Sequence, residues 1–288
     1  MNEFKKEIDN FDVVHIHMAS YRSTFRKGKY VRIAKTKGKK VIIHIHGAEY
    51  KVFYEKCNDK QKEEIREILN LADRLIVLSE EWQEFFETIV DKSKICVIYN
   101  SIVIPDNFEK NLDTNKVLFL GRVGQRKGIY DLIDVVERLI PDFPELKLYV
   151  GGDGEVDKLK QLIQEKKLEQ NVIYVGWTTG EQKEKLLREC SFYILPSYYE
   201  GMPMSVLEGM AYKNVVISTK VGGIPKVISN NENGMIIEPG DKETLYKFIV
   251  DLLNDSDRRA KLSQNARRTM EDKFDIKSKI EVLYSIYC

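Results

Sequence analysis

Short apolar runs alternate with longer, charged segments along almost the whole chain. The β-branched runs predict strands at Val13–Met18, Lys40–His46, Arg74–Ser79, Ile95–Tyr99, Val117–Gly121, Leu146–Gly151, Val172–Val175, Phe192–Leu195 and Val215–Ser218. Amphipathic stretches between them predict helices, for example at Gln61–Leu71, Ile129–Ile140, Glu155–Lys166 and Gly180–Glu189. After Asp241 the pattern is helical to the end. Strands that alternate with helices of this size predict βαβ units, and therefore an α/β protein with parallel sheets covered on both faces.

One segment interrupts this alternation. Ser101–Thr114 has no usable periodicity and carries Pro105, so we place a domain junction there. The expected domains are residues 1–110, with four strands, and 111–272, with at least five. Doubly wound domains usually open with a strand and a glycine-rich turn, but no glycine directly follows Val13–Met18. We therefore expect the first domain to be truncated.

Composition narrows the class of protein. The 288 residues carry 46 Lys plus Arg against 45 Asp plus Glu, a net charge of +1, which argues against a protein that coats nucleic acid. The chain has no uncharged apolar run of about 18 residues and no apolar signal segment at its start. The four cysteines lie far apart and predict reduced thiols, so we expect a cytoplasmic protein without a metal site.

The segment Leu195–Ala211 carries the clearest candidate chemistry. A strand ends at Leu195, a loop rich in Pro, Ser and Gly follows, and a helix is expected from about Met204. Ligands of α/β proteins bind at the carboxyl ends of parallel strands, where a helix amino terminus attracts anions. Glu200 and Glu208 would place two carboxylates beside that terminus, which suits a ligand with both phosphates and hydroxyls. Alternatively, both are solvated surface glutamates.

A second loop supplies cations. In Leu118–Ile129 a strand ends at Gly121, the loop holds Arg122 and Lys127, and a helix begins after Gly128. Fixed cations of this kind can stabilise the charge that develops on a diphosphate leaving group. The alternative is a solvated basic loop.

A third candidate site lies in the first half of the chain. His44 and His46 are two residues apart in a predicted strand, so they share one face of it. Histidines at strand ends are often structural. His46 is the better functional candidate because it lies where the strand ends.

Together these segments resemble the retaining glycosyltransferases of family 4, which have the GT-B fold of two facing Rossmann-like domains. Leu195–Ala211 resembles the Glu-x7-Glu signature of that family, and Leu118–Ile129 resembles its phosphate-binding loop. Ile42–Tyr50 resembles its His-Gly element, Asn100 its Asn-Gly step, and Gly222–Ile228 its Gly-Gly-Ile-Pro-Glu turn with Lys226 in the acidic position.

The resemblance implies transfer of a sugar from a UDP- or GDP-sugar to an acceptor hydroxyl, with retention at the anomeric carbon and without a metal or other cofactor. It implies that Glu200 contacts the donor sugar, that Glu208 holds the ribose hydroxyls, and that His46 acts with Glu200 in catalysis. Residues 273–288 would fold back on the first domain. The residues expected around the sugar and nucleotide are Gly201, Met202, Pro203, Met204 and Glu208, and those at the diphosphate are Arg122, Lys127, Ser205 and Val206.

Two further patterns have alternative interpretations. Asp255-Ser256-Asp257 has the form of a metal-binding D-x-D motif, but its position between two helices favours capping. Tyr21–Lys40 carries nine Lys or Arg and no acid. It is either a solvated helix face or a surface for anionic membrane lipid or a lipid-linked glycan acceptor, which would make the protein peripheral at the inner membrane face.

Two other functions compete with transfer. One is a nucleotide-sugar-binding fragment or pseudoenzyme that no longer catalyses, and the other, less favoured, is a sugar-nucleotide epimerase. Because complete family members carry an additional amino-terminal segment, we expect this chain alone to transfer sugar poorly.

Overall fold

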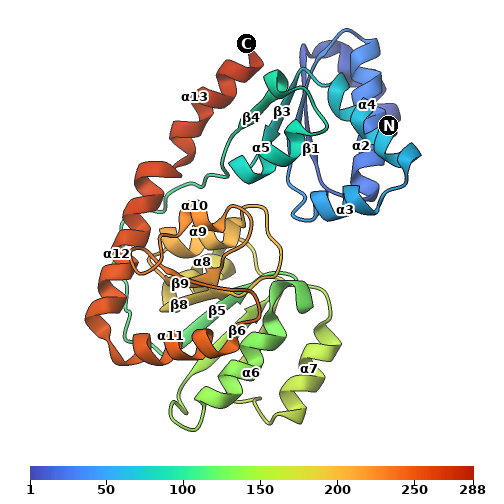
Figure 1. Ribbon diagram of the computed structural model, residues 1–288. Helices are drawn as coiled ribbons and strands as arrows, with labels where there is room; N and C mark the ends of the chain where they lie inside the picture. Colours follow the sequence, from blue (N-terminus) through green and yellow to red (C-terminus); the bar gives the residue numbers. More distant parts are fainter. The chain divides into compact units, whose positions relative to one another are not determined.

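The computed structural model describes residues 1–288, which form two compact units (Figure 1). Unit 1 comprises Met1–Asn100, Glu200–Met202 and Lys279–Cys288, and unit 2 comprises Ser101–Tyr199 and Pro203–Ser278. The chain thus passes between the units several times. None of its helices combines the length and the apolar character that crossing a membrane requires.

Unit 1 is built on a four-stranded parallel sheet in the order β1-β2-β3-β4. Its strands are β1 (Val13–Met18), β2 (Lys40–Ile45), β3 (Arg74–Val77) and β4 (Ile95–Val97). Its helices are α1 (Asn2–Glu7), α2 (Arg22–Thr36), α3 (Tyr50–Lys56), α4 (Asp59–Leu71) and α5 (Glu80–Glu87), with short 3-10 turns at Ile8–Asn10 and Lys92–Lys94.

The two faces of this sheet are covered differently. Because successive side chains of a strand point to opposite faces, Ile16, Ile43 and Leu75 enter the main core. The opposite face holds a smaller cluster of Ile42, Ile76 and Ile98. Leu283, Ile286 and Tyr287, from the last helix α13 (Ile276–Tyr287), pack against that cluster.

Unit 2 contains a six-stranded parallel sheet in the order β10-β9-β8-β5-β6-β7. Its strands are β5 (Lys116–Leu120), β6 (Lys147–Gly151), β7 (Val172–Gly176), β8 (Phe192–Leu195), β9 (Val215–Thr219) and β10 (Met235–Ile237). Its helices are α6 (Ile129–Leu139), α7 (Val156–Glu165), α8 (Gly180–Glu189), α9 (Met204–Ala211), α10 (Ile224–Val227), α11 (Lys242–Asn254) and α12 (Ser256–Lys273), with a 3-10 turn at Gln125–Lys127.

This strand order is that of a doubly wound Rossmann-like domain. The chain runs outward from β5 to β6 and β7, and then returns to the other side of β5 to form β8, β9 and β10. Every residue of β8 and β9 is buried, as expected of parallel strands covered on both faces. The point where the winding reverses, between β5 and β8, is where such sheets bind ligands.

The predicted α/β fold class is confirmed, with parallel sheets of four and six strands. The strand β10 was not predicted, because three residues at a sheet edge carry too little periodicity. The interpretation of Asp255 as a helix cap is confirmed, since its carboxylate accepts from the Arg258 N–H at 2.9 Å at the start of α12.

Candidate functional site

The loops that follow β5 and β8 start side by side. The two strands pair in register, Val117 with Phe192 and Leu118 with Tyr193. Both loops therefore begin at the same edge of the sheet, at the reversal point of unit 2. Each leads to a helix, α6 and α9, whose amino terminus also lies at this edge, as in ligand sites of doubly wound domains.

Hydrogen bonds join the two loops. The Tyr198 N–H donates to the Arg126 carbonyl at 2.8 Å, and the Arg126 guanidinium donates to the Tyr199 carbonyl at 3.0 Å. Gly128 has a φ of 71°, and a Cβ at this position would lie 2.0 Å from the Pro196 carbonyl oxygen. Only glycine allows this approach, so the sequence Lys127-Gly128 fixes one loop against the other.

The loop after β6 adds a third wall. The Gly121 N–H donates to the Gly151 carbonyl at 3.0 Å, and the Val123 N–H donates to the Asp153 carbonyl at 2.6 Å. A Cβ on Gly152 would lie 1.9 Å from the Gly121 carbonyl oxygen. The glycine-rich turn after β6 therefore brings backbone against backbone at the end of β5.

Each of the two candidate cations lies beside a glycine of these loops. The Arg122 side chain is exposed, and its Cγ lies 2.9 Å from the position that a Cβ on Gly154 would occupy. The Lys127 side chain is half-buried, and its Cδ lies 3.6 Å from the corresponding position on Gly121. Both side chains therefore start at the carboxyl end of β5, on the same side of the sheet as the amino termini of α6 and α9.

The amino terminus of α9 provides hydrogen-bond donors at the same edge. The N–H groups of Met204 and Ser205 have no acceptor, whereas the Val206 N–H donates to the Pro203 carbonyl at 3.1 Å. Ser205 is half-buried and Val206 is buried. Met204 and Ser205 are thus the donors open to an anion, and the helix dipole adds partial positive charge.

Glu208 lies on α9 and is held by an ion pair. Its Oε1 accepts from the Lys183 Nζ of α8 at 2.7 Å, which leaves Oε2 without a partner. Helix α9 can lie close to β8 because a Cβ on Gly209 would meet the Tyr193 ring at 2.8 Å. The free Oε2 could accept from a ligand hydroxyl.

Glu200, Gly201 and Met202 belong to unit 1. Glu200 is buried, with 7% of its surface exposed. The Asn100 Nδ2 donates to the Met202 carbonyl at 2.6 Å. A Cβ on Gly201 would lie 4.0 Å from the His46 carbonyl oxygen. Asn100, His46 and the Glu200 segment, which lie far apart in the sequence, are therefore neighbours within one unit.

His46 follows directly after β2, and its Nε2 lies 2.7 Å from the Nδ1 of His17. Desolvation, together with His17, His15 and Lys27, lowers the pKa of His46 to about 4. The imidazole is therefore neutral at pH 7. A group with so low a pKa is a poor proton carrier at that pH, so its natural role is to hydrogen-bond a ligand.

His15 and His17 were not among the residues predicted for the site. They lie on β1, next to His44 and His46, so the four histidines of the chain form one cluster. The signal was present as two His-x-His repeats, one in each strand.

Comparison with family models identifies the class of protein. The model described as glycosyl transferases group 1 matches residues 100–269, and the model of glycosyltransferase family 4 matches residues 1–104.

Two curated relatives illustrate the similarity. The chain is 28% identical over 247 residues to an uncharacterized glycosyltransferase of Methanocaldococcus jannaschii, covering 80% of this chain and 59% of that protein. It is 29% identical over 231 residues to a poly(ribitol-phosphate) alpha-N-acetylglucosaminyltransferase of Staphylococcus aureus, covering 79% of this chain and 46% of that protein. The chain thus matches about half the length of these relatives.

Solved structures agree on the fold. The crystal structure of TarM superposes with a TM-score of 0.81 at 25% identity, covering 99% of this chain and 57% of that one. The structure of HepE from Anabaena with UDP and glucose gives a TM-score of 0.84 at 18% identity, covering 99% and 79%. The chain belongs to the group 1 glycosyl transferases of glycosyltransferase family 4 and has their GT-B fold class.

Proposed function

We propose that the protein transfers a sugar from a nucleotide-sugar donor to an acceptor hydroxyl, with retention at the anomeric carbon, in polysaccharide or glycan assembly. The observation that carries this proposal is the arrangement at the reversal point of unit 2. The strands β5 and β8 are paired there. The loop after β5 carries the cations Arg122 and Lys127, and β8 leads to the amino terminus of α9, which carries Glu208.

The diphosphate of the donor would bind where positive charge is concentrated. Arg122, Lys127 and the amide of Ser205 supply charge-assisted hydrogen bonds, and the buried backbone of Val206 closes the site. When the bond between sugar and diphosphate breaks, these groups would stabilise the negative charge on the leaving nucleotide. Glu208 would accept from the ribose hydroxyls through Oε2.

Glu200 and His46 would act on the sugar. Glu200 would accept hydrogen bonds from sugar hydroxyls, with Gly201, Met202, Pro203 and Met204 lining the sugar. His46, neutral at pH 7, would hydrogen-bond the sugar as the anomeric bond breaks. A structure of a TarM mutant and the structure of HepE both contain UDP, which supports a uridine diphosphate sugar as the first donor to assay.

Calorimetric titration with UDP tests the nucleotide site. We expect Arg122→Ala and Lys127→Ala each to weaken binding by about 1.5–3 kcal/mol, the usual contribution of a hydrogen bond to a charged group. Lys247→Ala, which removes an exposed cation of α11, is the matched control and should leave the affinity unchanged. Unchanged affinity in both loop variants would refute the diphosphate assignment.

Mass spectrometry tests the transfer itself. Incubation with a panel of nucleotide sugars and a membrane lipid extract should yield a glycosylated acceptor and free nucleotide. Nucleotide binding without donor hydrolysis or transfer would instead support the alternative, a nucleotide-sugar-binding protein that does not catalyse.

We further propose a cytoplasmic location at an anionic membrane surface, where a lipid-linked acceptor would be found. Six of the nine cations in Tyr21–Lys40 already contact other groups of the protein. The three without such contacts are Arg22, Arg26 and Lys29. Salt-sensitive sedimentation with anionic vesicles, lost when these three become Gln, would support the proposal, and salt-independent binding would refute it.

A further inference from the structure

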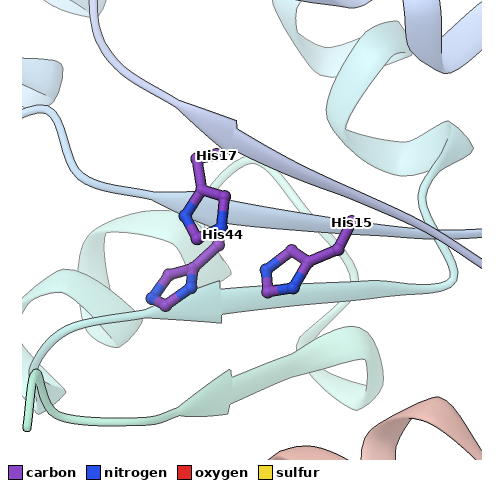
Figure 2. Close-up of side chains that lie close together, drawn as sticks. All are labelled: His15, His17 and His44. Carbon is purple, nitrogen blue, oxygen red and sulfur yellow. The ribbon is translucent and has the colours of Figure 1, made fainter.

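All four histidines of the chain lie on one face of the unit 1 sheet. His15 and His17 alternate along β1, and His44 and His46 alternate along β2 and its end. The two strands are parallel neighbours, and His17 is in register with His44. Figure 2 shows His15, His17 and His44 extending from these strands on the same side of the sheet.

Several nitrogen atoms of this cluster are buried without a hydrogen-bond partner. They are Nε2 of His15 and both Nδ1 and Nε2 of His44. A buried polar group without a partner costs about 1–3 kcal/mol, so three in one place are a substantial destabilisation for a sheet to retain. Apolar residues in place of His15 and His44 would avoid that cost. A bound cation would instead give the imidazole lone pairs a partner.

We propose that His15, His17 and His44 form a binding site for a divalent transition metal ion such as zinc. One ligand nitrogen from each of the three lies within 4.8 Å of the others. The Nδ1 of His15 is bonded to the Tyr287 hydroxyl at 2.7 Å, and the Nδ1 of His17 to His46 at 2.7 Å. The Nε2 atoms of His15 and His17 are therefore the ligands, together with one nitrogen of His44.

A small movement of the rings completes the site. Ligands 2.0–2.1 Å from a tetrahedral zinc ion are about 3.3 Å apart, so the nitrogens must approach by about 1.5 Å. The rings of His15 and His17 are stacked, with centroids 4.5 Å apart and an interplanar angle of 21°, and must turn to point their nitrogens at one centre. The χ2 torsion of histidine is broad, so the torsion itself opposes this rotation only weakly.

The histidine cluster lies next to the surface of unit 1. A hollow of about 430 Å³ beside β1, which is the first strand of its sheet, is lined in part by His15 and His17. Three protein ligands leave the fourth position of the ion to water or an anion.

The ligand set determines which ions fit. The cluster offers imidazole nitrogen and no carboxylate or thiolate, which favours zinc, copper, nickel or cobalt over magnesium and calcium. Lys27, which donates to the His17 carbonyl, adds positive charge and weakens the affinity.

The site would also act on His46. An ion on the Nε2 of His17 requires the remaining proton to be on Nδ1, so His17 would donate to the Nε2 of His46. The metal would thus fix the tautomer of His46, with its own proton on Nδ1. His17 would be a positioning residue for His46.

Metal titration of the whole chain tests the proposal. The protein is prepared without a polyhistidine tag, dialysed against a chelator, and titrated calorimetrically with zinc chloride at pH 7.5. We expect one equivalent of zinc to bind, and magnesium chloride to give no binding heat. Zinc binding below half an equivalent would overturn the proposal.

Two variants locate the site. His15→Gln and His44→Gln should each weaken zinc binding at least about 30-fold, and Cys288→Ser, which removes the one exposed thiol, should not. If His44→Gln fails to fold, the zinc affinity of His15→Gln alone tests the site, because His15 is only half-buried. Unchanged affinity in the histidine variants, or loss of binding in Cys288→Ser, would refute the assignment. The same variants are titrated with UDP in a separate experiment. Absence of zinc binding would then refute the metal site, and absence of UDP binding would refute the nucleotide site, independently of each other.

Discussion

Replacement of Gly128 should show whether the contact between the loops after β5 and β8 is needed for nucleotide binding, and not only for the stability of the fold. Its φ of 71° is left-handed, and a Cβ there would lie 2.0 Å from the Pro196 carbonyl oxygen. In Gly128→Ala, the left-handed conformation alone costs about 1–2 kcal/mol. Relief of the overlap requires the loops after β5 and β8 to separate by about 1 Å, and overpacking of this kind costs about 1–3 kcal/mol. We expect a total loss of about 2–5 kcal/mol in the free energy of unfolding.

Gly176→Ala is the matched control in the same unit. Gly176 has a φ of 79° and nothing within 4 Å of an added Cβ, so only the conformational cost of about 1–2 kcal/mol applies. Urea midpoints measure the stabilities, and calorimetry measures UDP affinity. We expect Gly128→Ala to bind UDP at least about tenfold more weakly, because Lys127 and α9 move apart, and Gly176→Ala to bind within about twofold of the parent. Equal effects of the two variants on affinity would show that the contact between the loops does not build the site.

Three further predictions address other parts of the protein. Glu208→Gln should raise the Kd for UDP alone, whereas Glu200→Gln should spare UDP and weaken the nucleotide sugar; tenfold weaker UDP binding by Glu200→Gln would reverse these roles. In metal-free protein, His46→Ala should lower kcat with little change in the KM for donor, and a change confined to KM would contradict a role in the transition state. Burial lowers the pKa of Lys110 to about 7, so from pH 7 to 8.5 the unfolded chain holds a proton that the folded chain releases. The free energy of unfolding, measured by urea denaturation, should therefore rise with pH, with a slope approaching about 1.4 kcal/mol per pH unit. This rise should be absent in Lys110→Met. Equal slopes in the parent and the variant would refute the role of Lys110.

The hydrophobic pattern predicted most of the unit 2 sheet because its strands are short, mostly apolar runs, several of which end next to glycine or proline. Helix α2 shows the limit of that approach. Its abundant cations suggested a surface, yet Thr24, Gly28, Val31 and Ala34 form a buried stripe. Gly28 lets α2 approach α4, since an added Cβ would lie 2.4 Å from an Ile68 side-chain carbon. Small residues give a weak hydrophobic signal even where two helices pack closely.

The sequence predicted those candidate residues that lie in a loop directly after a strand. It did not predict contacts between residues that are far apart in the sequence. Arg122 and Lys127 follow directly from the loop after β5. The bond from Asn100 to Met202 and the contact of His15 with Tyr287 join residues more than 100 positions apart, which local patterns cannot indicate. The histidine cluster becomes visible only when β1 and β2 are known to be parallel neighbours.

The division of unit 1 into separate stretches of sequence has a consequence for biosynthesis. Roughly 180 residues separate Asn100 from Lys279, which at about 5–20 residues per second takes the ribosome about 10–35 s to translate. During that interval the apolar face formed by Ile42, Ile76 and Ile98 has no Leu283, Ile286 or Tyr287 to cover it. The nascent chain would therefore present this face to chaperones until translation reaches α13.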